Sequence, residues 1–164
     1  MNLKTLRSKP FAFFKTFIST LFLAGITTTG LLAQTPSYVW AKTFGSTNAE
    51  IVNDIATNAA GDVYVTGYFR SSSINFGNSV TLTNPGTYNV YYLVKYNASG
   101  VAQWAKTIAG TPDGTTEGKS VAIDGSGNVI VTGQSDGDAT ANTNWDMATI
   151  AYSNSGVQIW ARRF

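Results

Sequence analysis

Three aspartates are the residues of this chain whose spacing could support catalysis. Asp136, Asp138 and Asp146 follow Gly133 closely, and two carboxylates that face one sugar can act as the acid and base of glycoside chemistry. A solvated Asp-Gly-Asp loop is the simpler interpretation, because the spacing does not give the carboxylate separation that this chemistry needs. The sequence has no histidine and no cysteine, which removes Ser-His-Asp triads, cysteine–histidine pairs and histidine-bound zinc. We therefore predict no catalytic residue and a protein that is not an enzyme.

The segment Asp124–Asn128 has oxygen-bearing side chains at alternate positions, as calcium loops do. It lacks the glycine after the third ligand and the distal bidentate glutamate of an EF-hand. The corresponding segment earlier in the chain offers only Asn58 and Asp62. Because a tight turn explains both segments, we predict no metal site and no cofactor.

Aromatic residues gather in or beside a long connection at about residues 70–88: Phe69, Phe76, Tyr88, Tyr91 and Tyr92. Exposed aromatic rings can stack on sugars or anchor a protein partner. Tyr91 and Tyr92 are expected to begin a strand and pack internally, since aromatics favour strands. Phe76 has no such strand and is therefore the candidate for an exposed ring. The sequence Asn97-Ala-Ser99 has the form of a glycosylation sequon, but we expect a turn there.

The first 33 residues have the pattern of a secretory signal peptide. A basic start, an apolar stretch from Phe17 to Leu32, and the small residue Ala33 before Gln34 predict cleavage after Ala33. The alternative is a membrane anchor, but the apolar core is short and rich in Thr and Gly. We expect no membrane span after cleavage, and a secreted or cell-surface protein.

Removal of this segment reverses the sign of the net charge. The whole chain has 11 basic and 9 acidic residues and a net charge of +2. Four basic residues lie in the predicted signal peptide, so 7 basic and 9 acidic residues remain. The basic isoelectric point therefore does not indicate a nucleic-acid partner.

One unit of sequence occurs twice in the remainder. Asp62-Val-Tyr-Val-Thr-Gly67 matches Asn128-Val-Ile-Val-Thr-Gly133, and Tyr96-Asn-Ala-Ser-Gly100 matches Tyr152-Ser-Asn-Ser-Gly156. The segment Trp40-Ala-Lys-Thr-Phe44 recurs at Trp104 and at Trp160. The order of the blocks is the same in both copies, which indicates a repeat architecture.

Each copy contains four short runs rich in Val, Ile, Tyr, Trp and Thr, which are typical of strands. The predicted strands are 51–58, 62–69, 89–97 and 101–108 in the first copy, and 118–124, 128–135, 145–152 and 157–164 in the second. Short Asx- and Gly-containing links predict antiparallel neighbours, so each copy is a four-stranded meander. A β-sandwich also has short antiparallel strands, but it is not expected to contain a repeated four-stranded unit.

We therefore predict an all-β fold that forms part of a β-propeller. Residues 34–50 would supply an N-terminal strand and link, residues 51–109 one blade and residues 110–164 another. The first strands, with Ile55-Ala56-Thr57 and Val121-Ala122-Ile123, would line the channel. The tryptophans of the fourth strands would pack between blades. Trp40–Phe44 would be a locking strand whose partner strands lie in the remaining blades of the same longer chain.

The pattern Asp/Asn-x-x-Gly-Asn/Asp-Val-x-Val-Thr-Gly, followed by a Gly turn and Trp-Ala-Lys-Thr, resembles the bacterial seven-bladed β-propeller repeat. The resemblance covers about residues 38–164. The first copy departs from it, with Asn58 for Asp and Asp62 for Asn. The resemblance implies an exported repeat protein and supplies no catalytic residue.

Two classes of function remain open at this point. The first is a non-enzymatic surface or secreted binding or structural module, which would contact a glycan or protein ligand through its blade loops. The second is the N-terminal part of an extracellular glycan lyase or hydrolase whose site lies elsewhere. The fold alone does not choose between the two.

Overall fold

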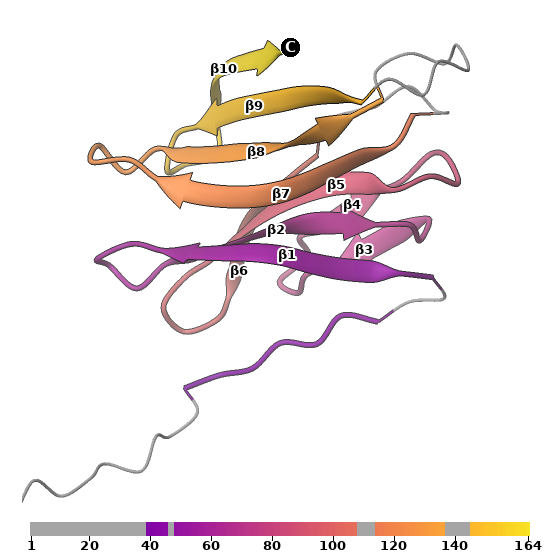
Figure 1. The fold of residues 1–164 in the computed structure, drawn as a ribbon. Helices are drawn as coiled ribbons and strands as arrows, with labels where there is room; N and C mark the ends of the chain where they lie inside the picture. Colours follow the sequence, from indigo (N-terminus) through magenta and orange to yellow (C-terminus); the bar gives the residue numbers. More distant parts are fainter. Residues whose placement is uncertain (1–38, 46–47, 108–113, 137–144) are drawn as a thin grey trace, which may run out of the picture. The chain divides into compact units, whose positions relative to one another are not determined.

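Ten strands and no helix form the regular structure of the described residues, 39–45, 48–107, 114–136 and 145–164 of the computed structural model. The predicted signal peptide and Asp138 lie outside these residues. The first sheet has the order β1-β2-β5-β6 and the second β10-β9-β8-β7, and the two are stacked (Figure 1). The strands of the first sheet are β1 (Glu50–Thr57), β2 (Val63–Phe69), β5 (Val90–Tyr96) and β6 (Ala102–Lys106). Those of the second are β7 (Thr116–Ile123), β8 (Val129–Ser135), β9 (Asp146–Tyr152) and β10 (Gln158–Arg163).

Every neighbouring pair in these sheets is antiparallel, so both copies are four-stranded meanders. This confirms the predicted all-β fold and its two repeat units. The strand bounds differ from the predicted ones by a few residues at most. We call the two meanders blade one and blade two.

The links between strands one and two, and between three and four, are tight turns of one kind. Asp124 shows the pattern: its Oδ1 accepts hydrogen bonds from the backbone N–H groups of Ser126 and Asn128 at 2.8 Å. Gly127 then takes a φ of +80°, which a residue with a side chain rarely adopts. The turns after Thr57, Tyr96 and Tyr152 have a glycine of the same conformation at the same place. The predicted turn chemistry is confirmed.

A β-bulge interrupts the first strand of each blade at the same position. The register shifts between Val52 and Asp54 in β1, and between Gly118 and Ser120 in β7. The glycine of each Val-Thr-Gly motif lies opposite. A Cβ on Gly67 would come within 1.9 Å of the Ile51 carbonyl oxygen, and a Cβ on Gly133 within 2.0 Å of that of Glu117. The motif therefore ends in glycine because the bulged backbone occupies the space of a side chain.

The side chains form two apolar layers. One face of blade one packs against blade two, and the shared cluster includes Tyr64, Leu93, Val131 and Tyr152. The opposite face of blade one forms a second cluster around Val94 and Tyr96. Blade one is therefore covered on both faces.

The long connection of blade one, predicted as a loop at about residues 70–88, contains a small sheet. Its strands are β3 (Ser73–Asn75) and β4 (Thr81–Thr83). Ile74 is buried in the second cluster, and Leu82 packs against it. These two strands were not predicted, because three-residue strands are too short to show an alternating pattern in the sequence.

Trp40–Phe44 was predicted to be a locking strand that pairs with strands of other blades. Residues 39–45 have no strand pairing among the described residues, and their side chains pack on the outer cluster of blade one. The rings of Phe44 and Phe76 are 5.3 Å apart, and those of Trp40 and Tyr96 are 5.8 Å apart. The segment therefore covers this face of blade one through side chains.

Candidate interaction surfaces

The fourth-strand tryptophan of blade one holds the turn of blade two. A Cβ on Gly156 would lie 2.9 Å from the Trp104 ring, and φ at Gly156 is +80°. The Trp104 Nε1–H donates a hydrogen bond to the carbonyl oxygen of Asn154 at 3.1 Å. The predicted role of this tryptophan, packing between blades, is confirmed. We call this contact the tryptophan–glycine lock.

The same lock occurs one repeat earlier. A Cβ on Gly100 would lie 2.7 Å from the ring of Trp40, and the Trp40 Nε1–H donates to the carbonyl oxygen of Ala98 at 3.1 Å. Ala98 and Asn154 hold the same place in the repeat. Residues 39–45 thus take the position toward blade one that β6 takes toward blade two.

The side chain of Asn154 adds contacts that only the interface of the two blades has. The Tyr64 hydroxyl donates to Asn154 Oδ1 at 2.7 Å, and the Lys95 ammonium donates to the same oxygen. Lys95 also pairs with Asp62 Oδ2 at 2.9 Å. Burial works against the charge of Asp62, but hydrogen bonds from Lys95 and Asn58 and the Lys95 charge outweigh it and lower the pKa of Asp62.

Polar contacts also join the inner edges of the blades, where β1 and β7 meet. Asp54 Oδ2 accepts hydrogen bonds from the Ser120 hydroxyl at 2.6 Å and from the Val121 N–H at 2.9 Å. These bonds, with one from the Ile55 N–H, lower the pKa of Asp54. Asn53, the extra residue of the bulge in β1, donates its side-chain N–H to the Gly118 carbonyl oxygen at 2.6 Å.

The aspartates considered for catalysis have separate structural partners. Asp136 Oδ1 accepts a hydrogen bond from the Thr115 N–H at 3.0 Å and so closes the end of the β7–β8 pair. Asp146 lies 3.9 Å from Arg163 Nε. Asp138 lies outside the described residues. The two described carboxylates are therefore engaged in holding strands.

The segment Asp124–Asn128, which was compared with calcium loops, forms the predicted tight turn, and its polar side chains bond within the turn. Both oxygens of Asp124 accept bonds from within the turn, and Oδ2 takes that of the Asn128 side chain at 2.8 Å. These hydrogen bonds lower the pKa of Asp124. No cluster of three acidic residues suited to a metal ion occurs among the described residues. Asn97 of the sequon also forms a turn, since its Oδ1 accepts bonds from the N–H groups of Ser99 and Val101.

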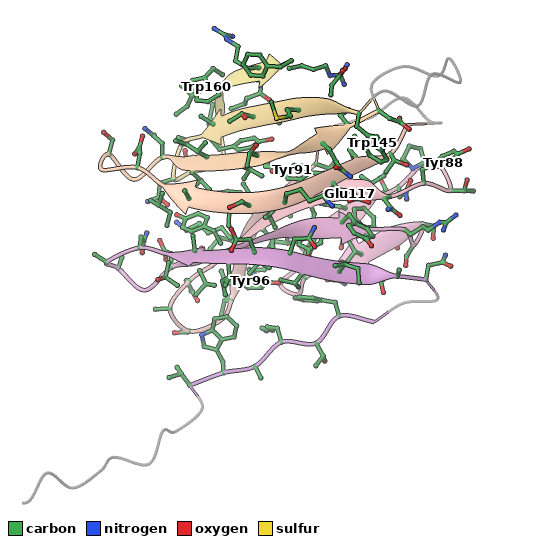
Figure 2. All side chains as sticks on the ribbon, viewed as in Figure 1. Tyr88, Tyr91, Tyr96, Glu117, Trp145 and Trp160 are labelled. Carbon is green, nitrogen blue, oxygen red and sulfur yellow. The ribbon has the colours of Figure 1, made fainter. Side chains whose placement is uncertain are left out.

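The aromatic residues of the long connection divide into buried and exposed ones. Tyr91 and Tyr92 begin β5 and are buried, as predicted, but on opposite faces: Tyr91 lies in the cluster shared by the two blades, and Tyr92 in the outer cluster of blade one. The expectation that Phe76 is exposed was wrong, because the ring is only 1% exposed and lies in the core of blade one. Tyr88 is 44% exposed. Trp145, which was predicted at the start of a strand, is 50% exposed. Figure 2 shows Tyr88 and Trp145 at the same end of the two blades.

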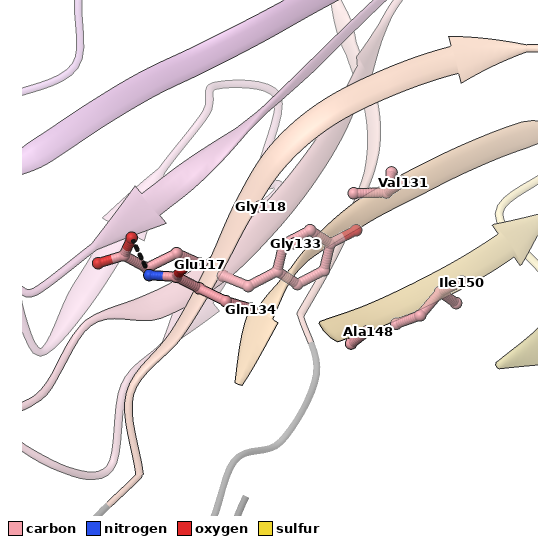
Figure 3. A pocket seen from close by; sticks show the side chains of 8 residues that line it. Glu117, Gly118, Val131, Gly133, Gln134, Ala148 and Ile150 are labelled. Atoms are coloured by element: carbon pink, nitrogen blue, oxygen red, sulfur yellow. Dashed lines mark hydrogen bonds between the residues drawn. The ribbon is translucent and has the colours of Figure 1, made fainter. Parts of the chain in front are cut away.

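A polar cluster that the sequence did not reveal lies at this end. The buried Glu117 carboxylate accepts a hydrogen bond from Gln134 Nε2 at 3.1 Å (Figure 3). It also accepts one from Asn89 Nδ2 at 2.6 Å and pairs with Lys119. Ile51 has the place of Glu117 in the other copy, so the repeat gives no signal for it.

The cavity beside Glu117 is too small for an organic ligand. Its volume is about 10 Å³, and Glu117, Gly118, Gly133, Gln134 and four other residues line it, which is room for about one water molecule. Tyr91 also lines this cavity, and its buried hydroxyl has no hydrogen-bond partner among the described residues. Burial, with the Tyr152 hydroxyl nearby, raises the pKa of Tyr91 well above its usual value.

Two antiparallel meanders that stack through a repeated tryptophan–glycine lock define a partial β-propeller fold. Comparison with known proteins agrees with this class. Residues 103–138 match the family model described as the SBBP beta-propeller repeat. Over 153 residues the chain is 27% identical to the "Uncharacterized WD repeat-containing protein L264" of Acanthamoeba polyphaga mimivirus. That match covers 88% of this chain but spans only 10% of the viral protein.

No helix among the described residues is both long and apolar enough to cross a membrane.

Proposed function

We propose that this chain is part of an exported, non-enzymatic repeat protein that binds a glycan or protein ligand through its blade loops. The observation that carries the proposal is the exposure of Tyr88 and Trp145 at one end of two blades that are otherwise locked together. Aromatic rings presented on a rigid scaffold are typical of binding surfaces.

The arrangement of polar groups supports binding over catalysis. The described carboxylates near this end have structural partners: Asp136 has a backbone N–H, Asp146 has Arg163, Glu50 has the Ser71 hydroxyl, and Glu117 has Asn89, Gln134 and Lys119. A carboxylate that is held by structural partners is poorly placed to exchange protons with a substrate. The likeness to a WD-repeat protein and to a β-propeller repeat also supports a repeat-based binding module.

Export is the second part of the proposal and rests on the N-terminal sequence. The basic start, the apolar stretch and Ala33 before Gln34 fit a signal peptide. Expression of the full chain in a bacterium, followed by fractionation and mass spectrometry, tests it. We expect an exported product that begins at Gln34. A cytoplasmic product that keeps Met1 would contradict export.

A glycan array tests the binding function, with turnover of the same glycans measured in parallel. We expect the full chain to bind at least one glycan without degrading it. The double variant Tyr88→Ala, Trp145→Ala should lose this binding but keep its stability, since both rings are half exposed. The matched control Val157→Ala removes another exposed side chain, which lies in the β9–β10 turn, and should bind as the parent does. Turnover of a bound glycan would overturn the proposal.

A further inference from the structure

An open pocket of about 200 Å³ lies in blade two, on the face that packs on blade one. Its lining residues come from three strands of blade two: Ser135, Ala148, Ile150, Ala161, Arg162 and Arg163. The pocket is at the end that carries Trp145, because Ser135 ends β8 and the residue after Trp145 begins β9. A cavity of about 150 Å³ holds a benzene-sized molecule. This pocket therefore has room for one six-membered ring with substituents.

The pocket exists because blade two has small residues where blade one has aromatic rings. Ser135 holds the repeat position of Phe69. Ala148 holds the position of Tyr92. Both rings are at most 1% exposed and lie in the outer cluster of blade one. Because the strand pairing around these positions is the same in both blades, the loss of the two rings leaves space and does not change the backbone.

Two further exchanges bring charge to the same place. Arg163 holds the repeat position of Thr107. Asp146 holds the position of Val90. Arg163 Nη2 donates a hydrogen bond to the Ser135 hydroxyl oxygen at 2.9 Å, and Arg163 Nε lies 3.9 Å from Asp146 Oδ2. Ser135 is only 2% exposed, so a buried hydroxyl holds the guanidinium at the pocket.

The lining residues suit a ligand that is apolar on one face and carries a carboxylate. Three of them, Ala148, Ile150 and Ala161, are apolar. Among the six described residues that line the pocket, two are arginines and none is acidic. A guanidinium binds a carboxylate through two parallel hydrogen bonds. The Ser135 hydroxyl accepts a bond from Arg163 and still has its own hydrogen to donate.

We propose that this pocket binds one uronic acid residue of a glycan, a sugar ring that carries a carboxylate. The Arg163 guanidinium binds the carboxylate, the Ser135 hydroxyl donates to a ring substituent, and the apolar residues contact the C–H face of the ring. The inference rests on the proposed function and narrows its ligand to an acidic glycan. A neutral sugar fits the space but leaves the positive charge of the lining without a counterion.

The pair of Arg163 with Asp146 does not oppose this binding strongly. The two side chains are 3.9 Å apart and about half exposed. Exposed ion pairs of this kind contribute little free energy. The guanidinium can therefore exchange this contact for a bidentate one with the ligand while Ser135 continues to hold it.

The experiment titrates the full chain, labelled at its Ala and Ile methyl groups, and follows the resonances of Ala148 and Ile150. Galacturonate and glucuronate are the probes, galactose and glucose are their neutral counterparts, and acetate supplies a carboxylate without a ring. We expect at least one uronate to shift both resonances. It should bind about tenfold more tightly than its neutral counterpart, since a hydrogen bond to a charged group is lost with the carboxylate.

Two variants test the pocket separately for space and for charge. Ala148→Tyr introduces the residue of blade one, fills the pocket and should abolish the response of Ile150 without lowering the urea midpoint. Arg163→Gln keeps the space and should weaken uronate binding about tenfold, with galactose binding unchanged. It decides the question if the first variant does not fold. The matched control Arg70→Gln removes an arginine that contacts Thr87 in blade one and does not line the pocket. It should bind as the parent does.

Equal affinity for the uronates and their neutral counterparts would overturn the inference, and so would unchanged uronate binding in Arg163→Gln. Acetate that binds as tightly as the uronates would show a site for small anions only. If the glycan array showed binding through Tyr88 and Trp145 while no uronate shifted Ala148 or Ile150, the inference would be wrong and the proposed function would stand. If uronates bound in the pocket but the Tyr88→Ala, Trp145→Ala variant kept all glycan binding, the inference would stand and the proposed binding end would be wrong.

Discussion

The carboxylate of Asp54 and the hydroxyl of Ser120, 2.6 Å apart, join the first strands of the two blades. Val121 adds its N–H to the same carboxylate oxygen. Asp54 and Ser120 hold the same position in the two copies of the repeat, and this bond links blade one to blade two where β1 and β7 meet. The outer edge is held by the tryptophan–glycine lock.

Acid should weaken the contact between the blades. The pKa of Asp54 is lower in the folded chain than in the unfolded one, so its contribution is present above about pH 4 and is lost as the pH falls through the folded value. Urea midpoints at pH 7 and pH 3 measure the effect. We expect Asp54→Asn to reduce the loss of stability in acid. Some loss should remain, because the pKa values of Asp62 and Asp124 are also lowered. An unchanged acid dependence in Asp54→Asn would contradict the assignment.

The bulge glycine should tolerate no side chain. Gly133→Ala places a methyl group 2.0 Å from the Glu117 carbonyl oxygen, so the β7–β8 pair has to shift at a cost of about 2 kcal/mol or more. Gly125→Ala is the matched control, because nothing lies within 4 Å of its Cβ. We expect that change to fall within about 0.5 kcal/mol of the parent. Chemical denaturation compares the two, and equal costs would show that the clash is relieved elsewhere.

Two variants should separate the stabilisation by the tryptophan–glycine lock of Trp104 into a packing contribution and a hydrogen-bonding contribution. Trp104→Phe keeps a ring against Gly156 but loses the bond to the Asn154 carbonyl oxygen, which we expect to cost about 1 kcal/mol. Trp104→Ala also loses the ring and should cost about 3 kcal/mol. Hydrogen exchange of the Ser153–Gly156 turn should increase in both variants. If Trp160→Phe destabilised the same chain as much as Trp104→Phe, the lock would not be the cause.

Phe76 and Tyr88 should behave in opposite ways although both belong to the long connection of blade one. Phe76→Ala opens a cavity among Phe44, Tyr92 and the rest of the outer cluster and should cost about 3 kcal/mol. Tyr88→Ala removes an exposed ring and should leave the free energy of unfolding nearly unchanged. Thermal denaturation distinguishes them. A stable Phe76→Ala variant would mean that the β3–β4 sheet does not contribute to the core.

Much of the fold was predictable because the same turn and strand motifs occur in both copies of the repeat. The turns at Asn58 and Asp124, with their glycines, fix where strands reverse, and the alternating apolar residues fix which face is buried. The packing role of Trp104 followed from its recurrence. These features depend on local geometry, which sequence patterns report well.

The features that were missed depend on contacts distant in the sequence. Phe76 was predicted to be exposed because only the short β3–β4 sheet brings its ring to the core. The polar cluster around Glu117 could not be predicted from the sequence, because its partner Asn89 comes from the other blade. The backbone of Trp40–Phe44 could not be predicted either. Its sequence is that of a fourth strand, but its position is set by side-chain contacts alone.

The insertion that carries β3 and β4 makes the connection of blade one ten residues longer than the corresponding one of blade two. Even so, β2 pairs with β5 in the same register as β8 pairs with β9. The connection between the second and third strands is thus a permissive site, where new sequence can be accepted without disturbing the ladder on either side. A designer could graft foreign peptides there, and the repeat would serve as a display scaffold.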